Sequence, residues 1–453
     1  MKKIISNWGN YPTIEADIFE FQQIHHLIKS KQSFTLRGLG RSYGDSSLGE
    51  RIVDTTKNRY FLHFDEEKGY LTCEAGISLA EILEVFVPKG WFLPVTPGTK
   101  FITIGGAISS DVHGKNHHKE GSFCKHVVSM EVLLASGKQI ECSPTKNVEL
   151  FQYICGGMGL LGAIKTATIK LKKIETAYIK QITYKAKNLE EMLTLFHQHE
   201  DSPYTVAWMD CLATGRNLGR GILFTGDHAK LEDLPLELRD KPLEIPKRRT
   251  LTIPFYFPSF VLNPLVVKIF NFLYYHTSFQ LGKPQIVDYD HFFYPLDSLL
   301  EWNKIYGKRG FVQYQFVLPK ENGLDGTKHI IEEIAKRKMG SFLVVFKVFG
   351  NPNKIPQEGS KKVIEFPFSF PKEGYTLALD FPLQPELEEL LSKLDEIVIK
   401  YNGRLYLTKD ARMKKEMFYS TYPVEDFLRV KKKYDPQNQF TSLQAQRLGL
   451  ITN

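Results

Sequence analysis

The chain has 453 residues, of which 42% are hydrophobic and 24% charged, an ordinary globular composition that excludes a disordered chain and allows two or three domains. Its net charge of +8 is spread along the chain, so we expect an anionic small substrate or an acidic membrane surface as partner, and no nucleic acid. The five cysteines are odd in number and lack CxxC spacing, which predicts reduced thiols in a cytosolic setting and no metal site.

Residues 1–176 are rich in glycine and β-branched residues and are predicted to form the first domain. Helices are predicted over 16–30, within 78–90, where Ser78 and Glu81 make a capping box, and within 147–157. Strands are predicted at 33–38, 70–76, 101–110, 125–144 with a hairpin turn at Ser136–Gly137, and 161–174.

After residue 176 glycine becomes rarer, and longer strands alternate with helices. Strands are predicted at 176–186, 205–213, 220–227, 311–319 and 341–350, and helices at 189–200, 326–340 and 387–403; the stretches 375–382 and 404–413 flank the last of these helices. This difference in composition and in element pattern predicts an α+β protein with two unlike domains. The second domain, over 177–403, is predicted to be an antiparallel sheet flanked by helices.

The segment 251–275 is apolar enough to suggest a membrane-spanning helix, but Pro254, Pro258 and Pro264 interrupt it, as does Lys268. Basic residues at 247–249 lie beside aromatic residues, which is typical of an interfacial membrane contact. The alternatives are a buried core segment or a lid over an apolar pocket, and the wider region 228–290 is a candidate mobile region. The N-terminus "MKKIISNWGNYP" has no apolar segment of the kind a signal peptide needs.

The stretch "FTLRGLGRSYGDSSLG" over 34–49 contains a glycine-rich loop, which comes directly after the β-type segment at its start. A dinucleotide loop of a nicotinamide enzyme has G-x-G-x-x-G spacing and opens a helix. Here the third glycine comes one residue later and polar turn sequence follows, so that interpretation fails. Glycines can still hold a phosphate through bare backbone N–H groups, whereas the alternative is a plain tight loop.

Two further stretches have the same character, "PGTKFITIGGAISSDVHGKNHH" over 97–118 and "GGMGLLGAI" over 156–164. Their small residues let a large flat ligand lie against the backbone. The polar group HGKNHH lacks the helical histidine spacing of a zinc site. Three such loops, each next to a predicted strand, favour a large extended cofactor over three unrelated turns.

These stretches resemble the FAD domain of the vanillyl-alcohol-oxidase-type flavoproteins. The resemblance continues through "FVQYQFVLP", "VVFKVFG", "LDFP", "GRLYLTKDAR" and "YDPQNQFTSLQAQRLGL", and these are similar to the decaprenylphosphoryl-ribose 2′-oxidase branch of that family. It implies an FAD domain of residues 1–176 completed by 404–453, and a substrate domain over 177–403. The cofactor-binding residues that it implies are Arg37, Gly38, Leu39, Gly40, Arg41, Ser42, Tyr43, Gly44, Asp45, Gly98, Thr99, Ile102, Thr103, Gly105, Gly106, Ala107, Ser110, His113, Gly114, Gly159, Ile164 and Tyr406.

The resemblance also implies roles for residues of the substrate pocket. Lys409, in "LTKDAR", is the matching pocket lysine that would hold or accept the substrate hydroxyl proton, with His113 and Tyr43 as further catalytic candidates. The implied substrate-binding residues are Gln313, Gln315, Lys347, Thr376 and Asp380. Gln313 and Gln315 lie two apart on a predicted strand, so both side chains point to one face.

Two positions depart from the family pattern. Mycobacterial relatives have a cysteine and an asparagine before the "DFP" aspartate, where this chain has Ala378 and Thr376. No thiol role is therefore carried over. Tyr43 stands where many oxidases of the superfamily have a histidine bonded to the flavin, so we expect non-covalent FAD.

The resemblance implies oxidation of the 2′-hydroxyl of a polyprenyl-phosphate pentose to a 2-keto sugar, the first half of an epimerisation that supplies arabinose for cell walls. A separate NAD(P)H-dependent short-chain reductase would complete it, and the location would be cytoplasmic or peripheral at the inner membrane. One alternative is a soluble sugar or aldonolactone oxidase of the same fold. Another is a binding protein that keeps the flavin fold without catalysis.

Overall fold

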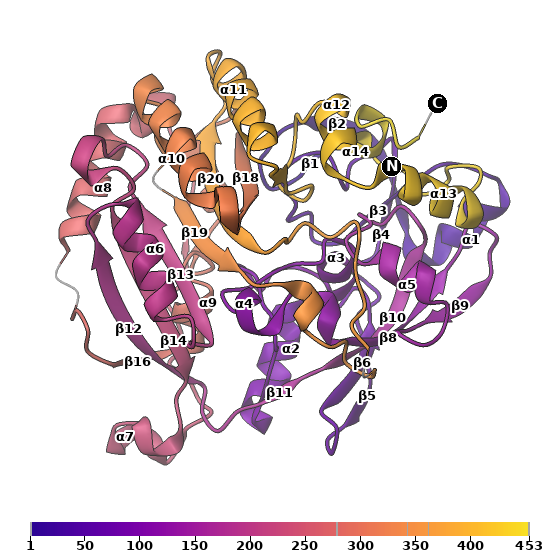
Figure 1. Ribbon diagram of the computed structural model, residues 1–453. Coiled ribbons are helices and arrows are strands. Elements are labelled where there is room, and N and C mark those ends of the chain that lie inside the picture. The colour runs from indigo at the N-terminus through magenta and orange to yellow at the C-terminus, as the bar shows by residue number, and fades with distance from the viewer. Residues whose placement is uncertain (1, 278–279, 342, 361, 452–453) are drawn as a thin grey trace.

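The computed structural model describes residues 2–277, 280–341, 343–360 and 362–451. Two parts lie side by side: the N-terminal third with the C-terminal helices, and a large twisted sheet with its covering helices (Figure 1). Buried apolar side chains of both parts belong to one continuous cluster, so the parts share a core. The fold is α+β, as predicted.

Two sheets make up the first part. The smaller sheet has the strand order β1-β2-β4-β3, with β1 and β2 antiparallel and the other two pairs parallel; its strands are β1 (Lys2–Ser6), β2 (Thr13–Glu20), β3 (Thr35–Arg37) and β4 (Arg51–Asp54). The larger sheet is antiparallel in the order β5-β6-β10-β8-β9, formed by β5 (Phe61–Asp65), β6 (Tyr70–Glu74), β8 (Val127–Leu133), β9 (Gln139–Cys142) and β10 (Ala163–Lys170). A short pair, β7 (Trp91–Phe92) with β11 (Lys172–Lys173), lies beside them.

Short helices connect these strands: α1 (Ile24–Lys29), α2 (Leu79–Phe86), α3 (Ile104–Ser109), α4 (His117–Glu120) and α5 (Val148–Ile154). The predicted capping box is confirmed, because Ser78 Oγ accepts from the Glu81 N–H at 3.2 Å and Glu81 Oε2 accepts from the Ser78 N–H at 2.8 Å. The hairpin at Ser136–Gly137 is confirmed too, with Gly137 at φ +79°.

Two predicted elements of this part are wrong. The helix over 16–30 begins only at Ile24 because residues 13–20 form β2, whose pairing with β1 and β4 overrides the helical pattern. The strand over 101–110 is helix α3, capped by Thr103 Oγ1, which accepts from the Gly106 N–H at 3.1 Å. Ile104, Ala107 and Ile108 are its buried residues, at helical spacing, so tertiary packing decided against strand propensity.

The second part is built on an antiparallel eight-stranded sheet, in the order β16-β12-β14-β13-β19-β20-β18-β21. Its strands are β12 (Tyr178–Ala186), β13 (Tyr204–Met209), β14 (Gly221–His228), β16 (Gln285–Asp288), β18 (Phe311–Pro319), β19 (Val344–Phe349), β20 (Gly374–Pro382) and β21 (Arg404–Leu405). Helices α6 (Leu189–Gln198), α10 (Lys320–Arg337) and α11 (Leu387–Lys400) cover one face of this sheet (Figure 1). The prediction missed the first six residues of α10, which begins at Lys320.

Smaller elements complete the second part: α7 (Leu236–Arg239), α8 (Pro264–His276), α9 (Tyr289–Phe293) and the parallel pair β15 (Leu251–Thr252) with β17 (Leu299–Leu300). Short 3-10 helices lie at Phe21–Gln23, Val87–Lys89, Phe123–His126, Gly215–Asn217, Leu231–Asp233, Ser259–Leu262, Trp302–Tyr306 and Pro352–Lys354.

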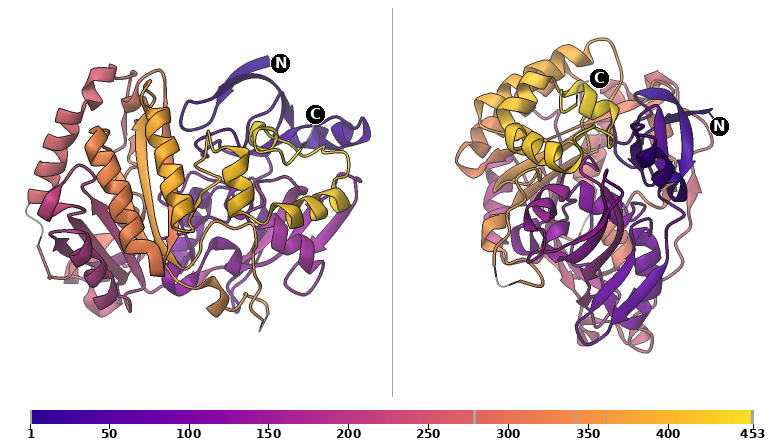
Figure 2. Two further views of the ribbon diagram at one scale, coloured as in Figure 1. Left: turned by 45° about the horizontal axis from the view of Figure 1, so that its top comes forward. Right: turned by 90° about the vertical axis from the view of Figure 1, so that its right-hand side faces the viewer.

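The C-terminal helices α12 (Lys415–Thr421), α13 (Val424–Tyr434) and α14 (Leu443–Arg447) return to the first part. Phe34 N–H donates to the Gln439 carbonyl at 2.7 Å, and Thr441 N–H donates to the Phe34 carbonyl at 2.9 Å. In Figure 2 the yellow C-terminal helices lie against the indigo N-terminal segment. The end of the chain therefore packs on its beginning, next to the first glycine-rich loop.

Helix α8 lies at the outer edge of the second part (Figure 1). Its large apolar side chains at Leu265, Ile269, Phe272 and Leu273 are each at least half exposed, so the core interpretation of this segment is wrong for α8. No helix among the described residues is long and apolar enough to cross a membrane.

Candidate functional site

A cavity of about 680 Å³ lies between the two parts. The three glycine-rich loops line it from the first part, and strands β12, β13, β14, β18, β19 and β20 line it from the second. Helices α6, α10 and α11 cover the opposite face of that sheet, which leaves this face free for a ligand (Figure 1). The fold thus brings loops separated by more than a hundred residues to one chamber.

The loop surface of the cavity is mostly bare backbone. Gly40 has φ +63°, a left-handed conformation that favours glycine, and a Cβ on Gly38 would stand 2.5 Å from Thr103 Oγ1. Gly98, Gly105 and Gly106 also line the cavity. Backbone N–H groups with nearby hydroxyls suit a pyrophosphate, and the long chamber suits an extended ligand, so these residues fit the FAD that the resemblance implies.

Most of the predicted cofactor residues line this cavity: Arg37, Gly38, Leu39, Gly40, Arg41, Ser42, Tyr43, Gly98, Thr99, Ile102, Thr103, Gly105, Gly106, Ser110, His113, Gly114, Gly159, Ile164 and Tyr406. Gly44, Asp45 and Ala107 do not. Ala107 is buried in the core on α3.

Gly44 and Asp45 attach the first loop to the C-terminal segment. A Cβ on Gly44 would collide with the Asp410 carbonyl, and Asp45 accepts two bonds from the Arg447 guanidinium at 2.8 and 2.9 Å. Arg447 also donates to Asp410 at 2.8 Å. These contacts hold the loop in place, so the glycine there is needed for chain packing.

Arg37 and Arg41 differ in what their guanidinium groups do. Arg37 donates to the Ser6 carbonyl at 2.7 Å and to the Asn7 side chain, so it stiffens the loop. The Arg41 guanidinium lies 4.0 Å from the centre of the Trp8 ring and faces the cavity. Arg41 therefore contributes positive charge to the chamber.

His113 stands at the centre of a polar cluster at the inner end of the cavity. Lys347 Nζ lies 3.0 Å from its Nδ1, and the Gln315 amide lies 3.1 Å from its Nε2. Burial, with help from Lys347, keeps the pKa of His113 well below its usual range, so the ring is neutral. The neutral ring has one acceptor nitrogen, so it accepts either from Gln315 Nε2 or from a protonated Lys347, and not from both at once.

Lys409 lies on the other side of the same inner end. Its Nζ is 3.9 Å from the centre of the Tyr43 ring. Burial lowers the pKa of Lys409 to about 8, and the Asp380 carboxylate opposes that decrease. A lysine with this pKa can hold or accept a proton near neutral pH.

Asp380 and Thr376 are predicted substrate residues that do not line the cavity. Asp380 accepts from Gln313 Nε2 at 2.5 Å and from Tyr306 Oη at 3.2 Å, and Gln315 lies 3.2 Å from Thr376 Oγ1. Both therefore orient the glutamines from behind. The pairing of β18 with β20 places these partners opposite or diagonally across the ladder.

The cavity is positive at its inner end. Lys347 and Lys409 line it there, while Lys115 lines the cavity with its Nζ 4.1 Å from the centre of the Phe292 ring; burial lowers the pKa of both Lys115 and Lys347 to about 7. The sequence placed Lys115 in the polar stretch HGKNHH but predicted no role for it. A small ligand with negative charge would be favoured here, since its binding compensates buried cations.

The outer half of the cavity is apolar, and the sequence pointed to only part of it. Trp208, Phe224, Phe270, Tyr274 and Phe292 line it, from two strands and two helices. Phe270 and Tyr274 are four residues apart on α8, in the segment 251–275 for which a lid over an apolar pocket was one expectation. The other three share no spacing with them, so the sequence held no signal for those. Ala378 also lines the cavity, and the described lining contains no cysteine; all five cysteines are free and buried.

Comparison with known proteins adds relatives to this geometry. Residues 17–143 match the family model described as "FAD binding domain". The chain is 37% identical over 421 residues to decaprenylphosphoryl-β-D-ribose oxidase of Mycolicibacterium smegmatis, covering 92% of this chain and 89% of that protein. It is 30% identical over 386 residues to an uncharacterized protein in the mprA 5′ region of Streptomyces coelicolor, covering 83% and 100%. L-gulonolactone oxidase of Scyliorhinus torazame is 26% identical over 196 residues, 41% of this chain and 44% of that enzyme.

Proposed function

The chain belongs to the family of decaprenylphosphoryl-β-D-ribose oxidase and is an FAD-dependent oxidoreductase, and from this premise we propose that it oxidises the 2′-hydroxyl of a polyprenyl-phosphate pentose to a 2-keto sugar. The observation that carries the proposal is the inner end of the cavity. Lys409, Gln313, Gln315, His113 and Lys347 meet there on the sheet face opposite the glycine-rich loops.

FAD, when bound, supplies the acceptor for the hydride that leaves the sugar carbon. Lys409 holds the hydroxyl of that carbon and takes its proton as the negative charge on oxygen develops. Tyr43 lies beneath the lysine, and its phenol stays protonated because burial raises its pKa well above the usual value. As a tyrosine it cannot make a histidyl link, so FAD is held there without a covalent bond.

The two glutamines and Lys347 position the sugar phosphate. Gln313 and Gln315 project from one face of β18, and Asp380 and Thr376 fix their amides. Lys347 meets the phosphate as a point charge, with His113 orienting its ammonium. The apolar outer half of the cavity accommodates the first part of the polyprenyl chain.

The test is anaerobic reduction of the flavin by candidate substrates. A polyprenyl-phosphate ribose should bleach the flavin absorbance rapidly, whereas free pentoses and aldonolactones should not. Lys409→Met should slow bleaching by about 10²- to 10⁴-fold without releasing FAD. Rapid bleaching by free sugars would favour the aldonolactone-oxidase alternative, and a Lys409→Met enzyme as fast as the native one would favour the non-catalytic alternative.

We further propose that α8 contacts the membrane that holds the lipid substrate. Leu265, Ile269, Phe272 and Leu273 form an exposed apolar stripe along it, while Asn271 on the opposite side is buried and donates to Asp210 at 2.8 Å. Residues Phe270 and Tyr274 of the same helix line the cavity, so a polyprenyl chain could pass from bilayer to site along α8.

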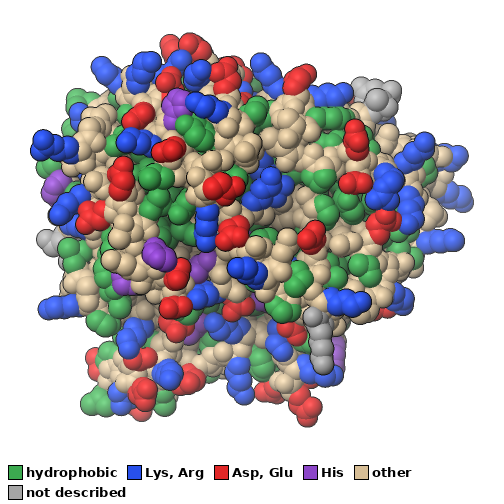
Figure 3. Space-filling model, viewed as in Figure 1, with side chains coloured by type: hydrophobic (Ala, Val, Ile, Leu, Met, Phe, Trp, Pro, Cys, Tyr) green, Lys and Arg blue, Asp and Glu red, His purple; other side chains and the backbone are tan. Residues whose placement is uncertain are grey.

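The basic residues before α8 support this contact only in part. Lys247 and Arg249 are exposed, but Arg248 donates to the Tyr294 carbonyl at 3.1 Å and pairs with Asp290 at 3.4 Å. Two of the three positive charges are therefore available to anionic lipids. Over the face drawn in Figure 3, acidic and basic side chains are interspersed, so a single-sign field does not dominate there.

Vesicle co-sedimentation tests the contact. The native enzyme should sediment with vesicles containing anionic lipid, and Leu273→Glu should lose most of that binding while keeping its FAD. Leu236→Glu is the matched control, because Leu236 is 76% exposed on α7, at the opposite end of the second part from α8 (Figure 1). Equal loss in both variants, or no sedimentation of the native enzyme, would contradict the proposal.

A reductase partner is proposed from the chemistry of the product. A 2-keto sugar needs a hydride donor to complete an epimerisation, and an NAD(P)H-dependent short-chain reductase supplies one. A location in the cytoplasm or at the inner membrane follows from that cofactor and substrate. Coupled turnover with such a reductase, followed by product stereochemistry, would test it.

A further inference from the structure

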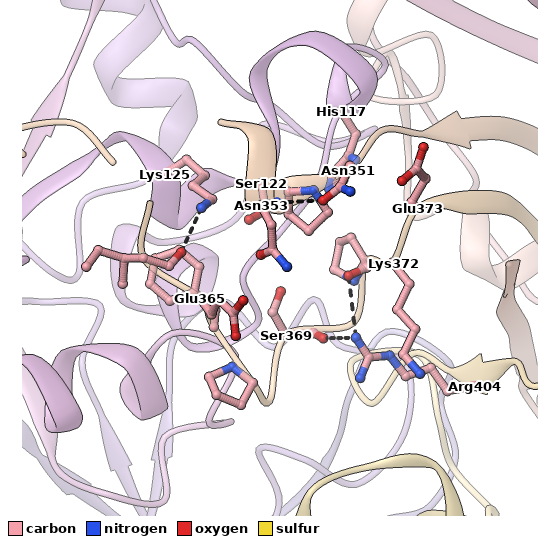
Figure 4. A pocket seen from close by; sticks show the side chains of 15 residues that line it. His117, Ser122, Lys125, Asn351, Asn353, Glu365, Ser369, Lys372, Glu373 and Arg404 are labelled. Carbon is pink, nitrogen blue, oxygen red and sulfur yellow. Dashed lines mark hydrogen bonds between the residues drawn. The ribbon is translucent and has the colours of Figure 1, made fainter. Parts of the chain in front are cut away.

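A second cavity, of about 300 Å³, is drawn in Figure 4. Its walls come from α4 and the 3-10 helix that follows, from the connection between β19 and β20, and from β21. The volume is at the lower end of small-molecule sites in proteins. It shares no lining residue with the larger cavity.

Three cations line this second cavity, from three different segments: Lys125, Lys372 and Arg404. Lys125 Nζ donates to the Ile364 carbonyl at 2.7 Å, and Arg404 donates to the carbonyls of Phe370 and Ser369 at 2.9 and 2.5 Å. Among the described residues none of the three cations forms an ion pair with a carboxylate. Asp111 and Glu365 offset part of the charge of Lys125 electrostatically, whereas Lys372 and Arg404 have no such carboxylate neighbour in the part of the chain that the structure describes.

Lys372 is the cation most available to a ligand. It is partly buried, and within the described part of the chain its ammonium has no hydrogen-bond partner. Burial lowers the pKa of Lys372 to about 8, and the neighbouring Arg404 adds to the decrease. Figure 4 shows the side chains of Lys372 and Arg404 together at one side of the cavity.

His117 forms another wall of the second cavity. Its side chain is 1% exposed, and neither ring nitrogen has a hydrogen-bond partner among the described protein groups. Burial lowers the pKa of His117 to about 3, so the ring is neutral and adds no charge to the cavity. The charge of the cavity therefore comes from the lysine and arginine side chains.

Two carboxylates border the cavity and limit what it can bind. Glu373 pairs with Lys320 at 3.2 Å, outside the cavity, and Glu365 is exposed at the mouth. Three cations, Lys125, Lys372 and Arg404, stand against two carboxylates, Glu365 and the buried Asp111 behind the wall, which leaves one positive charge in excess. A compact anion fits this balance, and a Lys–Arg pair is the usual recognition element for phosphate.

We propose that the second cavity is a separate ligand site that binds a small phosphate-bearing anion between Lys372 and Arg404. The amide of Asn353 at the mouth can add a hydrogen bond to the same ligand. Inorganic phosphate and a phosphorylated small molecule share this chemistry. The site is independent of the proposed sugar oxidation.

The ring of Phe349 lies between the second cavity and the larger one. Phe349 lies between the two histidines, with its ring centre 4.7 Å from that of His113 and 4.4 Å from that of His117. The two cavities are thus separated by a thin wall. A test must therefore distinguish phosphate in the second cavity from phosphate beside Lys347.

Calorimetric titration of the FAD-loaded enzyme with inorganic phosphate, at constant ionic strength, provides the test. Lys372→Met should weaken the affinity by about tenfold or more, because it removes one charge-assisted contact. Glu365→Gln should tighten it by about two- to fivefold by removing a carboxylate at the mouth. FAD content and thermal melting establish that each variant is folded.

Two further variants separate the sites. Lys362→Met removes the same charge from an exposed position on the same connection, and Lys347→Met removes it from the larger cavity. Both should bind phosphate within about twofold of the native enzyme. The proposal is overturned if phosphate does not bind, if Lys362→Met matches Lys372→Met, or if only Lys347→Met abolishes binding.

Discussion

Replacing Asp380 with asparagine tests how the cavity sets the protonation of Lys409. Asparagine has the same size and keeps an acceptor oxygen for Gln313 and Tyr306, but it loses the negative charge. Burial already lowers the pKa of Lys409 to about 8, and the Asp380 charge is what opposes further lowering. Asp380→Asn should therefore lower the pKa of Lys409.

The size of the shift follows from opposite charges in a shared buried site, about one unit or somewhat more, equivalent to about 1.4 kcal/mol. If the neutral amine is the proton acceptor, the rate of flavin reduction rises with pH and levels off above the pKa. In the native enzyme this rising part of the pH profile, here called the limb, lies near pH 8. Burial raises the pKa of Asp380 to about 7, so this carboxyl is mostly ionised at pH 8, where a shift of about one unit raises the neutral fraction of Lys409 from about one-half to about nine-tenths.

The assay is anaerobic stopped-flow reduction of the flavin across a pH series, which separates two readouts. The position of the limb reports the protonation of Lys409, whereas the height of the plateau reports how well Gln313 is held. Asp380→Asn should move the limb to lower pH and lower the plateau several-fold, since a charged acceptor for Gln313 is lost.

A variant of a second lysine tests whether the pH dependence belongs to Lys409. Lys347 stands in the same cavity, but its pKa of about 7 leaves it mostly neutral across a limb near pH 8, so Lys347→Met should leave the limb in place. A limb that stays in place in Asp380→Asn, or that persists in Lys409→Met, would refute the assignment of Lys409 as the proton acceptor.

Three other outcomes are expected. Acid precipitation of the purified enzyme should leave FAD in the supernatant, because Tyr43 cannot form a histidyl bond; flavin in the pellet would contradict this. Arg447→Met should lower the free energy of unfolding by about 3–5 kcal/mol in urea melts, because Asp45 and Asp410 lose their shared buried partner; a loss below about 1 kcal/mol would show that water replaces it. Ser78→Ala should lower it by about 1 kcal/mol through loss of the α2 cap, whereas Ser136→Ala, in the hairpin turn, is a control that should change it little.

The strands and helices with clear periodicity could be predicted from the sequence. The pattern of β18 gave the common face of Gln313 and Gln315, and Ser78 with Glu81 gave the start of α2. The element over 101–110 could not be predicted, because its β-branched residues favour a strand while its capping by Thr103 and burial of Ile104 and Ile108 favour a helix. That choice depends on neighbours distant in the sequence.

The residues of the candidate site were also only partly predictable from the sequence. Family resemblance pointed to Lys409, His113 and the glutamines by local motif. It did not indicate that Asp380 and Thr376 stand behind the glutamines, because a period of two gives the face of a side chain and not its partner. It also did not reveal Lys372 beside Arg404, since 32 positions and a strand of the large sheet separate them in the chain.

By itself the sequence determined the chemistry available to this protein: three glycine-rich loops for an extended cofactor, a tyrosine where a covalent link would need histidine, and a lysine in the stretch "LTKDAR". These are properties of residue type and local spacing, which do not depend on the fold. Tertiary structure alone decided the charge environment of each group, because pKa values and ion pairs depend on burial and on neighbours brought from far along the chain. For that reason Lys409 becomes a candidate proton acceptor, and Lys372 a candidate phosphate ligand, only in the folded protein.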